Sequence, residues 1–81
     1  MNPKPFHLYS TDGCHLCEQA WQLAVDIGQS EQLQVVDIVD DPALVEAYGI
    51  SIPVVKRLAD NAELFWPFEG EDLTTFIEGN A

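Results

Sequence analysis

The stretch that decides the fold is FHLYSTDGCHLCEQAWQLA, residues 6–24. Its first five residues form an aromatic and aliphatic run that is typical of a buried strand, and TDGC then signals a turn. A helical pattern begins after the turn and places apolar residues on one face at Leu16, Ala20, Leu23, Ala24 and Ile27. Gly28 is expected to end this helix. The two cysteines of the chain, Cys14 and Cys17, therefore lie where a strand ends and a helix begins.

The next segment predicts a second strand and a short helix. Residues 33–39, LQVVDIV, carry apolar side chains on both faces, as expected for a strand that is covered on both sides. The following helix should have Asp41 at its N-cap, Pro42 in its first turn and Gly49 beyond its end. The first half of the chain therefore forms a βαβ unit, and the cysteines lie at the carboxyl edge of its parallel strands, where open α/β sheets usually hold their sites.

The last third of the chain predicts a hairpin and a final helix. Two strand-like runs, 53–58 and 62–66, are separated by a turn signal. Residues 70–79 form the final helix, with acidic residues in the first turn, where the helix dipole favours them. The whole order is strand, helix, strand, helix, strand, strand, helix, which indicates one α/β domain over residues 1–81.

Composition restricts the function. The chain has 14 acidic and 3 basic residues, a formal charge of −11, and therefore lacks the basic face that binds nucleic acid. The acidity either keeps a small protein soluble or forms a face for a basic partner. No segment is apolar enough to span a membrane and the start of the chain lacks a secretory signal, so we expect a cytoplasmic protein without membrane contact.

The spacing of the cysteines favours redox chemistry. Structural disulfides are rare in the cytosol, where cysteine pairs are more often catalytic, redox-sensing or metal-binding. Cys14 at the helix cap would be exposed beside free backbone N–H groups, which favour its thiolate. Cys17, one turn inside the helix, would be shielded and able to attack a mixed disulfide formed by Cys14.

Three segments, GCHLCEQA, DIVDDPALVEAYGISIPVV and FWPFEGEDL, resemble the thioredoxin-fold glutaredoxin group, and the resemblance covers residues 6–77. It implies a thioredoxin-like fold of glutaredoxin type (βαβ-α-ββα), with a four-stranded mixed sheet and helices on both faces. It also implies that Cys14 is the nucleophile and Cys17 the resolving thiol. Pro53 would be a cis-proline beside the cysteines, and Ile52 would offer backbone groups to the substrate.

The resemblance also bears on the reductant. Glutaredoxins that use glutathione usually hold a lysine just before the first cysteine, where this chain has Asp12 and Gly13. Their site for the γ-glutamyl end of glutathione is only loosely matched by residues 70–72. We expect no bound cofactor. Glutathione is a possible reductant, but it is an anion that a strongly acidic chain would not attract. His15, between the cysteines, is a candidate substrate-binding residue whose protonated form would oppose the effect of Asp12 on the thiolate.

The sequence thus predicts a thiol–disulfide oxidoreductase that reduces protein or low-molecular-weight disulfides. Its expected partners are a disulfide-containing protein substrate or a thiol reductase, and we expect a monomer. A thioredoxin-like interaction module with incidental thiols is the first alternative. A zinc or iron–sulfur site is the second, but one cysteine pair with two histidines is a poor ligand set for zinc, so we expect no metal site.

Overall fold

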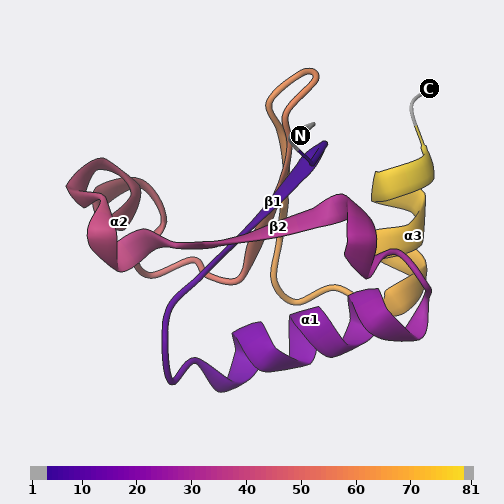
Figure 1. Cartoon of the computed structure of the whole chain (residues 1–81), viewed down its shortest axis with the longest axis horizontal. Coiled ribbons are helices and arrows are strands. Elements are labelled where there is room, and N and C mark those ends of the chain that lie inside the picture. The colour runs from indigo at the N-terminus through magenta and orange to yellow at the C-terminus, as the bar shows by residue number, and fades with distance from the viewer. Residues whose placement is uncertain (1–3, 80–81) are drawn as a thin grey trace.

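The chain forms a four-stranded sheet with three α-helices in the computed structural model, which describes residues 4–79 (Figure 1). The elements are β1 (Phe6–Ser10), α1 (His15–Asp26), β2 (Leu33–Asp37), α2 (Pro42–Tyr48), β3 (Val54–Arg57), β4 (Ala62–Phe65) and α3 (Gly70–Glu78). Short 3-10 turns precede and follow β2, at Ser30–Gln32 and Ile38–Asp40. Residues 1–3 and 80–81 lie outside the described range, and the single domain over 1–81 stays a prediction.

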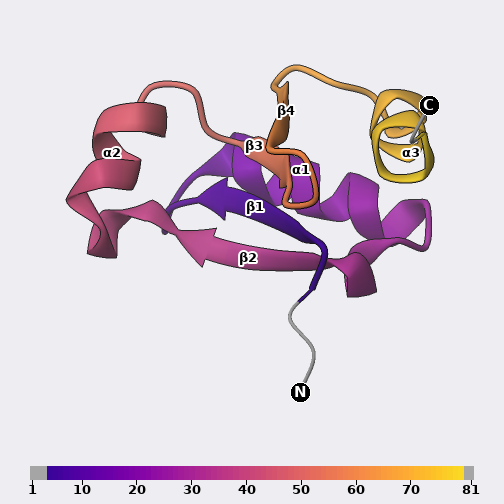
Figure 2. The ribbon, with the colours of Figure 1, turned by 90° about the horizontal axis from the view of Figure 1, so that it is seen from above.

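The sheet is mixed, which confirms the predicted fold class. Its strand order is β2-β1-β3-β4, with β1 and β2 parallel and β3 antiparallel to both β1 and β4. The register places Ser10 opposite Asp37 and Tyr9 opposite Val54. In Figure 2, the arrows of β1 and β2 point toward α2, on the side where α1 begins. We call this side, at the carboxyl ends of β1 and β2, the cysteine edge.

Alternating side chains of the strands pack into two clusters, one on each face of the sheet. The first face packs against α1 and α3, through Phe6, Leu8, Ala20, Ala24, Leu33, Val55, Phe68 and Leu73. The second face packs against α2 and the turn before it, through Tyr9, Ile38, Tyr48 and Val54. Neighbours along a strand, such as Leu8 and Tyr9, belong to opposite clusters because strand side chains alternate in direction. Helices therefore cover both faces, as predicted.

Several predicted boundaries were correct. Helix α2 has Asp41 at its N-cap, where the carboxylate accepts the Ala43 N–H at 3.0 Å. Gly28, with φ +74°, follows α1 in the left-handed region that glycine adopts without strain. The predicted hairpin turn contains Asn61 in the same region.

Three expectations were wrong, one about a strand boundary and two about packing. β2 ends at Asp37, and residues 38–40 turn away because the Asp37 carboxylate accepts the Val39 N–H at 2.9 Å. β2 is also an edge strand, so Val35 is 45% exposed and the strand is not covered on both sides. Leu16, predicted on the buried face of its helix, is 43% exposed, because the first turn of α1 directs Cys17 rather than Leu16 toward the core. A second cis peptide bond, Trp66–Pro67, was not anticipated.

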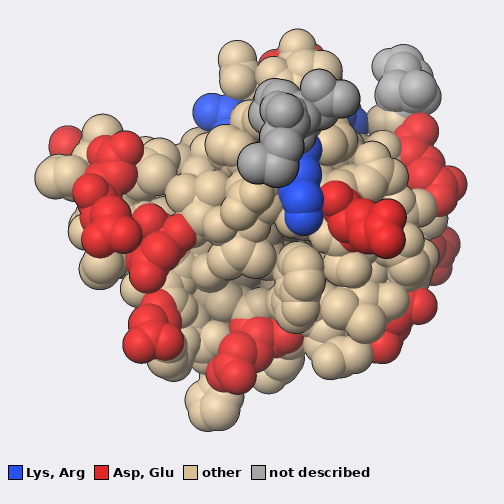
Figure 3. Space-filling view, viewed as in Figure 1, with Lys and Arg blue, Asp and Glu red and all other residues tan. Residues whose placement is uncertain are grey.

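The basic side chains are gathered at one end of the strands. Lys4 precedes β1, and Lys56 and Arg57 pair with its first residues, so all three basic residues lie at the end opposite the cysteine edge. The cysteine edge carries the carboxylates of Asp12, Glu18, Asp37, Asp40 and Asp41. Figure 3 shows the basic side chains in its upper part, whereas acidic ones lie over α2, along the lower edge and also on the right, beside the basic ones.

Candidate functional site

A tight turn carries the chain from β1 into α1. Gly13 has φ +80°, and a side chain there would meet no atom within 4 Å, so backbone conformation rather than space calls for glycine. The Cys14 N–H donates to the Thr11 carbonyl at 3.3 Å, which closes the turn. The Cys14 carbonyl then accepts the Glu18 N–H at 3.1 Å, the first bond of the helix. Cys14 is therefore the N-cap of α1, as predicted.

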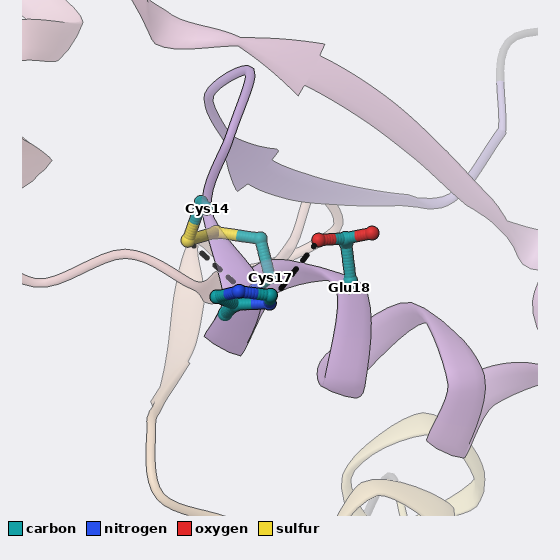
Figure 4. The surroundings of a disulfide bond; sticks show 4 residues. Cys14, Cys17 and Glu18 are labelled. Atoms are coloured by element: carbon teal, nitrogen blue, oxygen red, sulfur yellow. Dashed lines mark hydrogen bonds and ion pairs between the residues drawn. A yellow bond between two sulfur atoms is a disulfide. The ribbon is translucent and has the colours of Figure 1, made fainter.

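Cys14 and Cys17 form a disulfide, with their Cα atoms 5.2 Å apart (Figure 4). The Cys17 N–H donates to Cys14 Sγ at 3.1 Å, so a free amide of the helix start points at this sulfur. Cys17 is 5% exposed, whereas Cys14 is half-buried. After reduction, this amide and the helix terminus would stabilise negative charge on Cys14 and leave Cys17 shielded.

His15 and Glu18 lie on the first turn of α1, next to the disulfide. The His15 Nδ1 and Glu18 Oε2 atoms are 3.6 Å apart, and the two side chains are 93% and 74% exposed. In Figure 4, the side chains of Cys17 and Glu18 leave α1 in the same direction. The structure thus brings Cys14, Cys17 and His15 together, while the role of His15 toward a substrate remains a prediction.

The Ile52–Pro53 peptide bond is cis, as the resemblance implied. Continuing the register of β1 and β3 places Pro53 opposite Ser10, so this bond lies at the cysteine edge. Pro53 is fully buried, and the Ile52 N–H donates to the Tyr48 carbonyl at 3.1 Å. That N–H is therefore already bonded within the protein. The substrate-binding roles of both residues stay predictions.

Tyr48 holds the segment that leads to Pro53. Its carbonyl accepts N–H groups from both Ser51 and Ile52, and its ring stacks on Tyr9 with centroids 4.6 Å apart. Its hydroxyl donates to the Glu63 carboxylate on β4. This hydrogen bond, together with burial and the negative charge of Glu63, raises the pKa of Tyr48 to about 12. Sequence reasoning missed this contact because its partners come from different elements.

A cleft of about 630 Å³ borders the disulfide on the α1 side of the sheet. Its lining includes both cysteines, Asp12 and, along α1, Glu18 and Trp21. From the sequence, Trp21 was expected in the core or at its rim, and no role was predicted for Glu18. One signal for Trp21 was present, because it lies four residues after Cys17 and so shares its helix face.

The first turn of α3 is rich in carboxylates. It contains Glu71 and Asp72, and the Asp72 carboxylate accepts the Glu69 N–H at 2.8 Å. This is the segment that loosely matches the glutathione-binding segment of glutaredoxins. One N–H at this helix start is thus already bonded to the chain's own carboxylate.

Two further observations concern the described residues alone. Within 4–79, no three His, Cys, Asp or Glu side chains gather in a way that could hold a metal ion. No helix in the same range has the length and apolar character needed to cross a bilayer.

A dithiol–disulfide pair at the start of the first helix, beside a cis-proline at the same sheet edge, defines a thioredoxin-fold protein of glutaredoxin-like class. The model of the glutaredoxin-like domain family (DUF836) matches residues 6–78. The chain belongs to this family.

Solved structures agree with this assignment. The chain is 34% identical to Northeast Structural Genomics target protein XcR50 from X. campestris, whose X-ray structure superposes with a TM-score of 0.83 over 94% of this chain and 99% of that chain. The solution structure of the same target gives 0.81, at 34% identity, over 95% and 96%. Protein Ne2328 from Nitrosomonas europaea, at 22% identity, has a TM-score of 0.71 over 94% and 93%, which supports the fold alone. No curated protein matches the sequence.

Proposed function

We propose that this protein is a thiol–disulfide oxidoreductase in which Cys14 is the nucleophile and Cys17 the resolving thiol. The observation that supports this most strongly is the asymmetry of the pair. Cys14 is half-buried and accepts a helix N–H, whereas Cys17 is 5% exposed behind it. A substrate sulfur therefore reaches Cys14 first.

The reaction proceeds in two exchanges. The Cys14 thiolate attacks one sulfur of a substrate disulfide, forms a mixed disulfide and releases the other sulfur as a thiolate, which takes up a proton. Cys17 loses its proton to water and attacks Cys14 Sγ, which closes the Cys14–Cys17 disulfide and releases the second substrate thiolate. Two electrons pass from the protein dithiol to the substrate, and an external dithiol reductant must restore the protein.

We infer that the reductant is a dithiol protein partner rather than glutathione, and that no cofactor is bound. Glutathione carries a net negative charge, and the cysteine edge carries carboxylates with all lysines and arginines at the far end. The helix start that would receive its γ-glutamyl end contains Glu71 and Asp72. We expect the protein to act in the cytoplasm, where reduced thiols persist. We also expect it to act as a monomer.

The test is a single-turnover reaction of the reduced protein with a model protein disulfide and, separately, with a glutathione mixed disulfide. We expect rapid exchange with the first and slower exchange with the second. The Cys14→Ser variant should be inactive. The Cys17→Ser variant should stop at a mixed disulfide that mass spectrometry detects.

The alternative is a scaffold that binds a partner without using its sulfurs. Equal partner binding by the wild type and a Cys14→Ser/Cys17→Ser variant, together with no disulfide exchange, would support that alternative. Exchange that persists in Cys14→Ser would contradict the assigned roles of the two thiols.

A further inference from the structure

The cleft beside the disulfide joins the redox pair to two carboxylates from different segments. The turn before α1 contributes Asp12 and Cys14 to its lining, and α1 itself contributes Glu18 and Trp21. Val35 of β2, which is 45% exposed, lines it from the sheet. The volume of about 630 Å³ lies within the range of roughly 300–1,000 Å³ that is usual for ligand sites.

Among the residues that the structure describes, no lysine or arginine lines this cleft. Asp12 and Glu18 are exposed, and the basic residues of the protein lie at the opposite end of β1. The His15 Nδ1 is 3.6 Å from Glu18, but this side chain is 93% exposed and does not line the cleft. The cleft therefore presents a negative potential next to the sulfur that a substrate must reach.

Trp21 adds an aromatic surface to this charge. It is half-buried, packs against the core between α1 and the sheet, and lines the cleft one helical turn after Cys17. An indole ring attracts ammonium and, above all, guanidinium groups, and guanidinium also pairs with carboxylates. Carboxylates from two segments and an aromatic ring together form a site suited to a basic side chain.

We propose that this cleft selects substrates in which a lysine or arginine lies one or two residues from the disulfide-bonded cysteine, with arginine preferred. The proposal rests on the oxidoreductase function above and names its substrate class. Both cysteines border the cleft, and an extended peptide advances about 3.3–3.6 Å per residue, so a neighbouring side chain reaches it while the substrate sulfur meets Cys14. The exchange itself is the two-step reaction already written.

The test uses three peptide disulfides of equal length that carry Arg, Gln or Glu beside the cysteine. Each is mixed with the pre-reduced protein, so no further reductant is needed. Each single-turnover rate constant is divided by the rate constant of the same peptide with dithiothreitol, which removes differences in intrinsic reactivity. We expect the normalised rate for the Arg peptide to exceed that for the Glu peptide about tenfold at low salt, and less at high salt.

Variants separate the cleft from the overall charge. In the Asp12→Asn/Glu18→Gln variant, the normalised rate for the Arg peptide should exceed that for the Glu peptide only about twofold. This ratio is informative even if the substitutions alter the reactivity of Cys14, because such a change affects both peptides alike. The matched control is Glu31→Gln/Glu71→Gln, which removes two exposed carboxylates away from the cleft, before β2 and on α3. This control should retain the ratio of the wild type.

The outcomes are distinct. Equal normalised rates for the three peptides in the wild type would overturn the inference while leaving the oxidoreductase function intact. A control variant that loses the preference as fully as the cleft variant would also overturn it, because overall charge would then explain the selectivity. No exchange with any peptide would contradict the proposed function itself.

Discussion

Replacing Tyr48 with phenylalanine removes one hydroxyl group from the contact between α2 and the sheet. That hydroxyl donates to the Glu63 carboxylate, while the ring stacks on Tyr9 with centroids 4.6 Å apart and the carbonyl accepts two N–H groups of the loop before Pro53. The substitution keeps the ring and the backbone. Its effect therefore reports on the hydrogen bond that ties α2 to β4.

The structure sets the size of the effect. A pKa of about 12 instead of 10 corresponds to at most about 2.7 kcal/mol. Glu63 is exposed, however, and solvent weakens the interaction, so we expect a loss of about 1 kcal/mol in the free energy of unfolding. For a domain of this size, such a loss lowers the melting temperature by about 4–8 °C.

The pH dependence has a definite sign. The fold favours neutral Tyr48, so its contribution is complete below the unfolded pKa of about 10 and is lost as pH rises toward about 12. Urea unfolding followed by tryptophan fluorescence should therefore show that the wild type exceeds Tyr48→Phe in stability at pH 8. The two proteins should approach equal stability above pH 12.

Tyr9→Phe is the matched control, because the Tyr9 hydroxyl makes no hydrogen bond to any residue in 4–79. It should cost clearly less than Tyr48→Phe at pH 8. If the two substitutions cost the same, or if Tyr48→Phe is neutral, the hydrogen bond to Glu63 does not hold α2 and the reasoning fails.

Two further changes test the fold. The Arg57 guanidinium donates to the carbonyls of Phe76 and Gly79 at the end of α3, at 2.9 and 3.0 Å, and to both carboxylate oxygens of Asp60. A lysine ammonium cannot reproduce this fork of donors, so Arg57→Lys should lower the melting temperature by several degrees. The hydrogen bond from Arg57 lowers the pKa of Asp60, so ionised Asp60 stabilises the fold above pH 3.8 and this contribution is lost at lower pH. The free energy of unfolding of Arg57→Lys should therefore fall less steeply than that of the wild type as the pH is lowered through this range. Leu73→Ala, at a side chain that is 1% exposed, should cost about 2–5 kcal/mol in urea unfolding, and a loss below 1 kcal/mol would contradict its place in the core.

Much of the fold could be predicted because the ends of its elements are marked by residues close in sequence. The N-cap at Asp41 and the glycine after α1 are short-range signals, and both were read correctly. The end of β2 could not be predicted from the apolar pattern, because the Asp37 side chain bonds the Val39 N–H and overrides it. The exposure of Val35 depends on strand order, which no local pattern specifies.

The candidate site divides in the same way. The placement of Cys14 at the helix cap followed from adjacent residues alone. The cleft did not, because it needs Val35 of β2 beside the first turns of α1. The bond between Tyr48 and Glu63 likewise joins α2 to β4, and no sequence periodicity relates these two positions.

The most direct test of the central claim is the alkylation rate of each cysteine in the reduced protein, measured at pH 7 by iodoacetamide labelling and peptide mass spectrometry. The amide that points at Cys14 Sγ and the shielding of Cys17 predict that Cys14 reacts at least tenfold faster than Cys17, and faster than an unstructured cysteine peptide. Comparable rates for the two cysteines, or faster labelling of Cys17, would contradict the assignment of Cys14 as the nucleophile.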